Sequence, residues 1–261
     1  MRLDWKGQQV QVREFGQGPA VVLVHGYPLD GAMWSGVARA LSAHFRVLKP
    51  DLPGRGENPT AAEGGIEGYA DFLEAIFGQL QPPAGLAGFS MGGYVSLALL
   101  KRGPASVRAA ALVDTRSGAD DESGRAGREA AIAAVRAGGA AAIVDGMIPK
   151  LLSPAAAQNA SLVERLQRII LRQKPETIES DLTAMRDRPD STEFLARIAI
   201  PAIVLAGDQD VVTPPAEGQA MAAAIPGASF VSIAGAGHLT PMERPGAVAA
   251  ALSEFFAASL A

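Results

Sequence analysis

Continuous apolar runs recur along the chain, and each of them is closed by polar or glycine residues. Val-Val-Leu-Val-His at residues 21–25 is the first of these runs. A short run without polar alternation is typical of a strand that is buried on both faces, as in parallel sheets. We therefore predict strands whose runs end at the following residues: His25, Asp51, Ser90, Thr115, Asp210 and His238.

Most of these runs are separated by stretches rich in alanine and leucine, in which apolar residues recur at helical spacing. Such stretches cover residues 33–45, 66–80, 94–103 and 215–227. Strands that alternate with helices indicate an α/β protein, with a mostly parallel central sheet flanked by helices.

Residues 117–197 interrupt this alternation. They contain no convincing strand pattern, only helical stretches separated by prolines. The sequence therefore predicts a helical insertion before the penultimate strand, whereas residues 1–116 and 198–261 together form the core of the fold.

Composition narrows the classes of function. A chain of 261 residues with 48% hydrophobic and 19% charged residues can bury a full core. It has no cysteine, which excludes disulfides, thiolate metal sites and cysteine nucleophiles. Because there are also only three histidines, we expect neither a metal nor a cofactor.

The charge balance argues against polyanionic partners. The formal net charge is -4, so the sequence lacks the excess of basic residues that nucleic acids or anionic membranes demand. No window approaches about 18 uninterrupted apolar residues, and the charged N-terminus does not resemble a signal peptide. We therefore expect a cytoplasmic monomer or homodimer that acts on a small molecule, without nucleic acid or membrane.

A candidate nucleophile lies in Gly88-Phe89-Ser90-Met91-Gly92, between a predicted strand and a predicted helix. A serine at such a sharp turn is held in strained backbone, and small residues two positions away let the chain pass closely. The amides at the start of the helix favour negative charge that develops beside the serine. The motif alone is weak evidence, because glycine-rich turns also arise for packing.

A serine hydroxyl needs a base, which is most often a histidine. His25 ends a buried strand and His44 ends a helix, and both positions indicate structural or surface roles. His238 follows the last strand on a Gly-Ala-Gly loop and precedes the final helix, where a side chain can face the carboxyl edge of the sheet. It is the favoured base.

The base needs a carboxylate to fix its tautomer, and three aspartates are candidates. Asp210 is favoured, because it lies at the tip of the loop after a strand and before a helix. Asp208 is closer to the strand, and we expect it to accept hydrogen bonds from turn amides. Asp114 ends the preceding strand and could approach the same histidine across the sheet edge.

An oxyanion hole normally combines the amide after the nucleophile with an amide from the loop after an early strand. Here the candidates are the amide of Met91 and an amide of residues 25–28, among which Tyr27 fits best. Gly26 allows the backbone to turn inward, and Pro28 stiffens the loop without offering an amide of its own.

With these motifs in this order, the chain resembles the α/β-hydrolase family over nearly its whole length. The resemblance implies that Ser90 is the nucleophile, Asp210 the acid and His238 the base, and that the amides of Tyr27 and Met91 hold the oxyanion. The motifs are HGYP at 25–28, DLPGRG at 51–56, GFSMGG at 88–93, GDQDVVTP at 207–214 and GAGHLTPMERP at 235–245.

The resemblance also makes residues 117–197 similar to the family's helical cap, or lid, which folds over the site and shapes the pocket. Within the family, the chain is similar to small carboxylesterases, 3-oxoadipate enol-lactonases, pimeloyl-carrier-protein esterases and cofactor-free perhydrolases. The related haloalkane dehalogenases use an aspartate at the position of Ser90, so this serine argues against a dehalogenase.

We therefore expect a serine hydrolase that cleaves small carboxylic esters through an acyl-enzyme on Ser90. The same triad would also suit an enol-lactone hydrolase, a perhydrolase or a hydrolase of carbon–carbon bonds. A small-ligand binding protein without turnover is a third hypothesis. In the cap, where Phe194 is the only aromatic residue, we expect an aliphatic pocket lining drawn from Ile143, Met147, Ile148, Leu151 and Met185.

Overall fold

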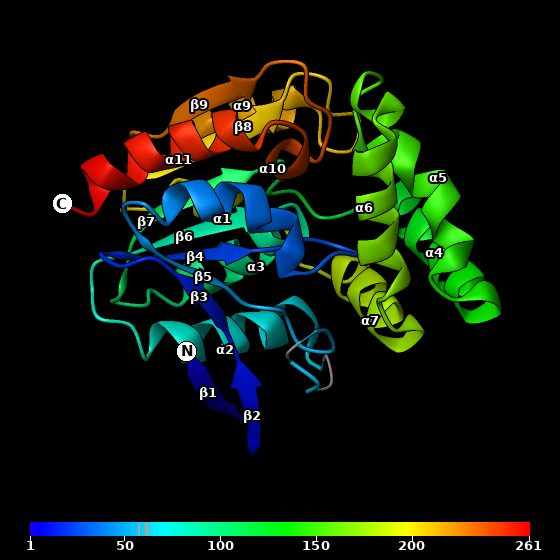
Figure 1. The fold of residues 1–261 in the computed structure, drawn as a ribbon, viewed down its shortest axis with the longest axis horizontal. Helices are drawn as coiled ribbons and strands as arrows, with labels where there is room; N and C mark the ends of the chain where they lie inside the picture. Colours follow the sequence, from blue (N-terminus) through cyan, green and yellow to red (C-terminus); the bar gives the residue numbers. More distant parts are fainter. Residues whose placement is uncertain (57, 61–62) are drawn as a thin grey trace.

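The computed structural model describes residues 1–56, 58–60 and 63–261, and it contains a seven-stranded sheet in the order β3-β5-β4-β6-β7-β8-β9 (Figure 1). Six strands run parallel to one another, in the order β5, β4, β6, β7, β8 and β9. At one edge, β3 pairs antiparallel with β5. The predicted mostly parallel sheet is therefore confirmed. The strands are β3 Arg13–Phe15, β4 Ala20–Val24, β5 Arg46–Lys49, β6 Ala84–Phe89, β7 Val107–Val113, β8 Ala202–Gly207 and β9 Ser229–Ile233.

The apolar pattern does not predict the strands at the N-terminus. β1 (Arg2–Trp5) and β2 (Gln8–Gln11) pair antiparallel as a separate two-stranded sheet, and β3 forms the edge of the main sheet. Leu3 and Val10 are buried there, whereas the residues beside them are polar and exposed. Because strands of this kind turn one face to solvent, a search for continuous apolar runs does not find them.

Helices cover both faces of the main sheet (Figure 1). Along β4, Val21 and Leu23 pack into the cluster shared with α1 and α11, whereas Val22 and Val24 pack into the cluster shared with α2 and α3. In the described residues, no helix is both long and apolar enough to cross a membrane. The helices of these layers are α1 Ser35–Leu41, α2 Gly65–Phe77, α3 Met91–Lys101, α9 Pro215–Ala224, α10 Thr240–Glu243 and α11 Pro245–Ser259.

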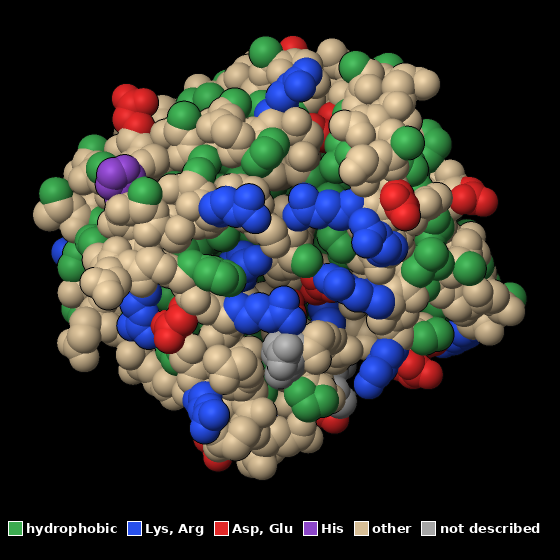
Figure 2. All heavy atoms as spheres, in the orientation of Figure 1, with side chains coloured by type: hydrophobic (Ala, Val, Ile, Leu, Met, Phe, Trp, Pro, Cys, Tyr) green, Lys and Arg blue, Asp and Glu red, His purple; other side chains and the backbone are tan. Residues whose placement is uncertain are grey.

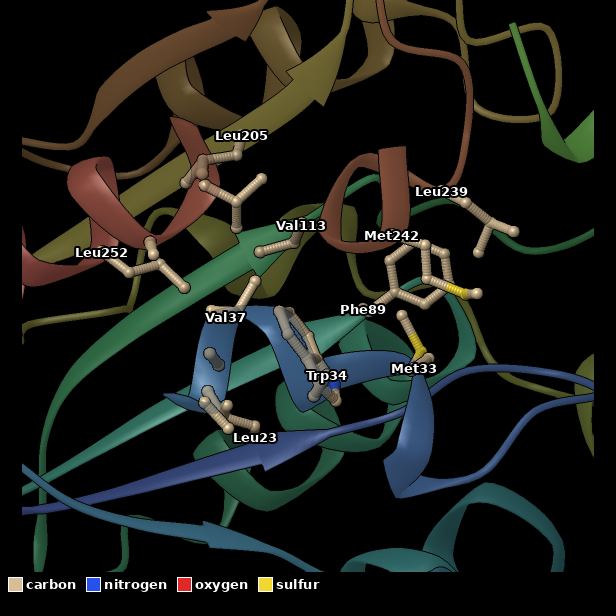
Figure 3. Close-up of a cluster of buried hydrophobic side chains, with 14 of the residues drawn as sticks. Leu23, Met33, Trp34, Val37, Phe89, Val113, Leu205, Leu239, Met242 and Leu252 are labelled. Atoms are coloured by element: carbon tan, nitrogen blue, oxygen red, sulfur yellow. The ribbon is translucent and has the colours of Figure 1, made fainter. Parts of the chain in front are cut away.

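Figure 3 shows part of the core between the sheet and the layer of α1 and α11. The ring of Trp34 meets Phe89 edge-on, with ring centroids 6.4 Å apart, and both side chains are fully buried. Phe89 also lies 5.0 Å from the His238 ring, measured between centroids. Core packing therefore fixes the carboxyl end of β6 at the place where the candidate nucleophile follows.

A group of helices connects β7 to β8 and lies beside the carboxyl ends of the parallel strands (Figure 1). Residues 117–197 are all described, and they contain helices but no strand. The division of the chain into a core and a cap stays a prediction. The main helices of this segment are α4 Glu122–Gly138, α5 Ala141–Leu151, α6 Ala160–Leu171, α7 Pro175–Arg186 and α8 Thr192–Leu195.

Charged side chains connect this helical segment to the rest of the fold. Figure 2 shows basic side chains gathered on the face that carries α1 and α6. Arg172, which directly follows α6, donates to both carboxylate oxygens of Asp30, at 2.7 and 2.5 Å. On α7, Asp181 is fully buried and accepts hydrogen bonds from Arg55 and Tyr69.

Candidate active site

Ser90 lies at the sharp turn between β6 and α3. Its backbone has φ 50° and ψ −116°, and a positive φ is uncommon for a residue other than glycine. The Ser90 amide donates to the Val113 carbonyl (3.0 Å), and the Ser90 carbonyl accepts from the Gly93 amide (2.8 Å) and the Thr115 hydroxyl (2.8 Å). Bonds to the end of β7 and to the residues after it thus hold the strained turn in place.

Close approach of chain segments at this turn requires glycine at two positions. A Cβ atom on Gly88 would collide with the Gly92 carbonyl. A Cβ atom on Gly26 would lie 2.9 Å from the Phe89 carbonyl oxygen and 3.0 Å from Ser90 Cβ. The loop that follows β4 therefore passes directly against the turn that carries Ser90.

The structure brings Ser90, His238 and Asp210 together in one line of hydrogen bonds. His238 Nδ1 lies 2.8 Å from Asp210 Oδ2, and His238 Nε2 lies 3.0 Å from Ser90 Oγ. An ionised carboxylate can only accept, so Nδ1 carries the proton and Nε2 of the neutral ring is free to accept from the serine hydroxyl. The arrangement can therefore take a proton from Ser90.

Asp210 is held as an ionised acceptor. Burial raises its pKa, but the contact with His238 and the hydrogen bonds from Thr213 lower it, and the net shift is below its ordinary value. Asp210 Oδ1 accepts from the amides of Val212 (2.7 Å) and Thr213 (3.0 Å), and Oδ2 accepts from the Thr213 hydroxyl (2.7 Å). Sequence reasoning missed Thr213, although its place three residues after a candidate acid was a usable signal.

The other two histidines have no part in this arrangement. His25 is fully buried, its Nε2 accepts from the Leu52 amide (3.0 Å) and its Nδ1 donates to the Gly26 carbonyl (3.0 Å). Burial, together with the nearby charge of Arg55, lowers the pKa of His25 to about 3. The ring is therefore neutral and structural, whereas His44 is exposed at the turn after α1.

The other two candidate acids bind elsewhere. Asp208 accepts from the Gly235 amide (2.8 Å), in agreement with its expected role in a turn. Asp114 accepts from the Gly207 amide (2.8 Å) and from the Thr240 hydroxyl. Among the described residues, no group of three or more His, Asp or Glu side chains is placed to hold a metal ion.

The two candidate oxyanion donors flank the nucleophile. Met91 is the first residue of α3, and the first amides of a helix have no partner within that helix. Tyr27 lies on the loop after β4 and lines the same cavity as Ser90. Within the described part of the chain, no backbone acceptor is found for either amide.

A cavity of about 160 Å³ opens beside the candidate nucleophile and base. Met147, Leu151 and Met185 from α5 and α7 line it, as the sequence predicts. Ile143 and Ile148 do not line it, and both are buried in the hydrophobic core clusters.

The sequence predicts an aliphatic pocket lining, and this prediction is wrong in one respect. Arg116, Arg128 and Lys150 also line the cavity, together with Tyr94. They are far apart in the sequence, and only the fold brings them together. The one usable signal was the position of Arg116, directly after a predicted strand end. Phe194 lines a separate cleft.

Comparison with known proteins identifies the family. The model of the alpha/beta hydrolase family matches residues 21–251, a span that includes all the candidate residues. The chain belongs to the alpha/beta hydrolase family. The resemblance inferred from the motifs is therefore confirmed, as is the fold class.

Relatives of this alpha/beta hydrolase include esterases. The pimeloyl-[acyl-carrier protein] methyl ester esterase of Chromobacterium violaceum is 30% identical over 237 residues, which cover 87% of this chain and 90% of the relative. A malate-bound thermophilic esterase from Thermogutta terrifontis has a TM-score of 0.94 at 33% identity, covering 100% of this chain and 99% of its own. The enol-lactonase of Burkholderia xenovorans LB400 has a TM-score of 0.88 at 26% identity, covering 98% and 100%.

Proposed function

We propose that this alpha/beta hydrolase is a cofactor-independent serine hydrolase that cleaves small carboxylic esters. The observation that carries the proposal is the line of hydrogen bonds from Ser90 through His238 to Asp210, at 3.0 and 2.8 Å. It joins a nucleophile, a base and an acid that fixes the base's tautomer, in the order that serine hydrolases use. The esterases among the relatives support an ester as the bond that is cleaved.

The first half of the proposed reaction forms an acyl-enzyme. Ser90 Oγ attacks the ester carbonyl carbon while its proton passes to His238 Nε2. The carbonyl oxygen becomes an oxyanion, which accepts hydrogen bonds from the amides of Tyr27 and Met91. Asp210 stabilises the imidazolium ring, which then gives the proton to the departing alcohol as the tetrahedral intermediate collapses.

The second half releases the acid. A water molecule gives a proton to His238 Nε2 as its oxygen attacks the acyl carbon. The same two amides hold the second oxyanion, and the proton returns to Ser90 Oγ as the carboxylic acid leaves. No atom or electron is needed from outside the ester and the water, so the proposed chemistry balances without a cofactor.

The helical segment of residues 117–197 is proposed to act as the cap of this site. Met147, Leu151 and Met185 of this segment line the same cavity as Ser90, which supports that role. A cavity of about 160 Å³ is smaller than the roughly 300–1,000 Å³ typical of pockets for drug-sized ligands. We therefore propose small esters as substrates.

Lactone opening is a second candidate, and one observation favours it. The enol-lactonase of Burkholderia xenovorans LB400 shares the fold at 26% identity over 98% of this chain. A lactone is a cyclic ester, so the same nucleophile, base and oxyanion donors would open it. Only the shape of the substrate separates this candidate from the first.

The decisive experiment is hydrolysis of p-nitrophenyl esters from acetate to laurate by the wild-type protein and by Ser90→Ala. We expect turnover of the short esters and a loss of about 10⁴–10⁶ in kcat in the variant, by analogy with other triads. Circular dichroism of both proteins shows whether the variant is folded. Full turnover by folded Ser90→Ala would contradict the proposal.

A further inference from the structure

One buried carboxylate is shared by three guanidinium groups at the edge of the proposed site. Asp120 Oδ1 lies 2.5 Å from Arg116 Nη2 and 2.9 Å from Arg188 Nη1, and Asp120 Oδ2 lies 3.0 Å from Arg128 Nε. The Asp120 side chain is fully buried. One negative charge faces three positive charges, so the cluster keeps a net positive charge.

Each guanidinium group has five N–H donors in all, and only some of them bind Asp120. Arg188 donates to the carbonyls of Met185 (2.6 Å) and Gly118 (2.7 Å) and stacks on the ring of Tyr94, 4.1 Å from its centroid. The Nε atoms of Arg116 and Arg188 are both buried without a hydrogen-bond partner among the described residues. One carboxylate therefore does not neutralise the three guanidinium groups.

Arg116 and Arg128 line the same cavity as Ser90. Arg116 directly follows Thr115, whose hydroxyl donates to the Ser90 carbonyl (2.8 Å). Burial raises the pKa of the Tyr27 hydroxyl, and Arg128 is close enough to oppose that rise. The two cations therefore face the space in which a substrate of Ser90 would lie.

We propose that this cavity selects esters that carry an ionised carboxylate in addition to the scissile bond, such as a monoester of a short dicarboxylic acid. The inference rests on the proposed ester hydrolysis and names its substrate class. A guanidinium group matches a carboxylate with two parallel hydrogen bonds. Arg116 and Arg128 are only 27% and 24% exposed, which limits screening by solvent. Lys150 adds a third positive charge to the cavity wall.

The carboxylate can belong to either half of the ester, and two isosteric pairs of substrates distinguish the halves. Monomethyl succinate carries it on the acyl half, and methyl isocaproate replaces it with an isopropyl group. Acetoxyacetate carries it on the alcohol half, and isobutyl acetate is its neutral counterpart. We would measure kcat/KM for all four esters by titrating the released acid at neutral pH.

We expect the wild-type protein to prefer the charged ester of at least one pair by about tenfold to a hundredfold in kcat/KM, as charge-assisted hydrogen bonds would give. Arg128→Gln should reduce this ratio about tenfold, as should Arg116→Gln. Arg136→Gln is the matched control, because Arg136 lies on α4 as well but is exposed and pairs with Glu179. It should leave the ratio unchanged.

A competition experiment uses the wild-type protein alone, so its result does not depend on whether the variants fold. Succinate should compete with methyl isocaproate, and succinamide at the same concentration should not. Cleavage of the neutral esters with no preference for a charged ester in either pair would overturn the inference and leave the proposed function standing. A preference that survives in both folded variants would overturn it as well, whereas no hydrolysis of any ester would overturn both proposals.

Discussion

Asp114 and Asp210 follow the neighbouring strands β7 and β8, and the charge of Asp210 adds to burial in raising the pKa of Asp114 well above its usual range. The pKa of Asp210 is lowered instead, because His238 and Thr213 outweigh the effect of its burial. The pKa values of these two neighbouring carboxyl groups are therefore shifted in opposite directions. Two acids in similar places along the sheet edge have different chemical roles.

Substitution of each aspartate by asparagine tests this difference. Asp210→Asn cannot fix the tautomer of His238, and we expect kcat to fall by about 10⁴, as in other triads. Asp114→Asn replaces the carboxyl by an amide of nearly the same shape, and Asp114 binds Gly207 and Thr240 rather than His238, so kcat should stay close to that of the wild type. Steady-state kinetics on a short p-nitrophenyl ester measures both. Equal losses in the two variants would show that the acid is wrongly assigned.

Asp114 also makes stability depend on pH. Its pKa is raised in the folded protein, whereas in the unfolded chain an aspartate has a pKa of about 3.9. Between these values the folded state binds more protons, so this group's contribution to the free energy of unfolding declines as pH rises above about 4. Asp114→Asn removes the titrating group, and the variant should gain stability relative to the wild type as pH rises from about 4 to 8. Urea unfolding at several pH values measures the difference, and a difference that does not change with pH would contradict the assignment.

Much of the candidate site could be predicted because it follows the parallel strands. A strand buried on both faces appears as a continuous apolar run, and the polar residue that ends each run lies at the same edge of the sheet. Ser90, Asp210 and His238 each end such a run or lie on the loop that follows it. Their sequence positions therefore imply that they meet at this edge of the sheet.

The rest could not be predicted, because it depends on contacts between segments that follow no pattern in the sequence. β1 and β2 bury only alternate residues such as Leu3 and Val10. Apart from the place of Arg116 after a strand end, Arg116 and Arg128 look like ordinary charged residues along the sequence. The fold brings both to the cavity wall, where each pairs with the buried Asp120. The formal net charge of -4 over the whole chain does not reveal this local excess of positive charge.

The loop after β4 gives a test of the proposed oxyanion hole. In Gly26→Ala the new Cβ atom would lie 2.9 Å from the Phe89 carbonyl oxygen, and backbone cannot move aside as a flexible side chain can. The loop must shift and take the Tyr27 amide with it, so we expect kcat to fall by about 10²–10³, the typical loss of one oxyanion donor. Gly246→Ala is the control, because nothing lies within 4 Å of its added Cβ. An active, folded Gly26→Ala would contradict the role of this loop.

A buried ion pair joins the loop after β5 to the helical segment. Arg55 and Asp181 are both fully buried, and Tyr69 donates to the same carboxylate. The pair ties α7, whose Met185 lines the cavity, to the core of the fold. Removing one partner would leave the other charge buried without its counter-ion.

Arg55→Met should therefore lower the free energy of unfolding by about 3–5 kcal/mol, the usual cost of breaking a buried pair from one side. The double variant Arg55→Met with Asp181→Leu removes both charges, and replacement of a whole buried pair by apolar residues is often neutral or stabilising. We expect it to be more stable than Arg55→Met alone, even though it carries more substitutions. The free energies of unfolding of the wild type, Arg55→Met, Asp181→Leu and the double variant, measured in urea, complete a double-mutant cycle. Additive losses would show that the two side chains are not coupled.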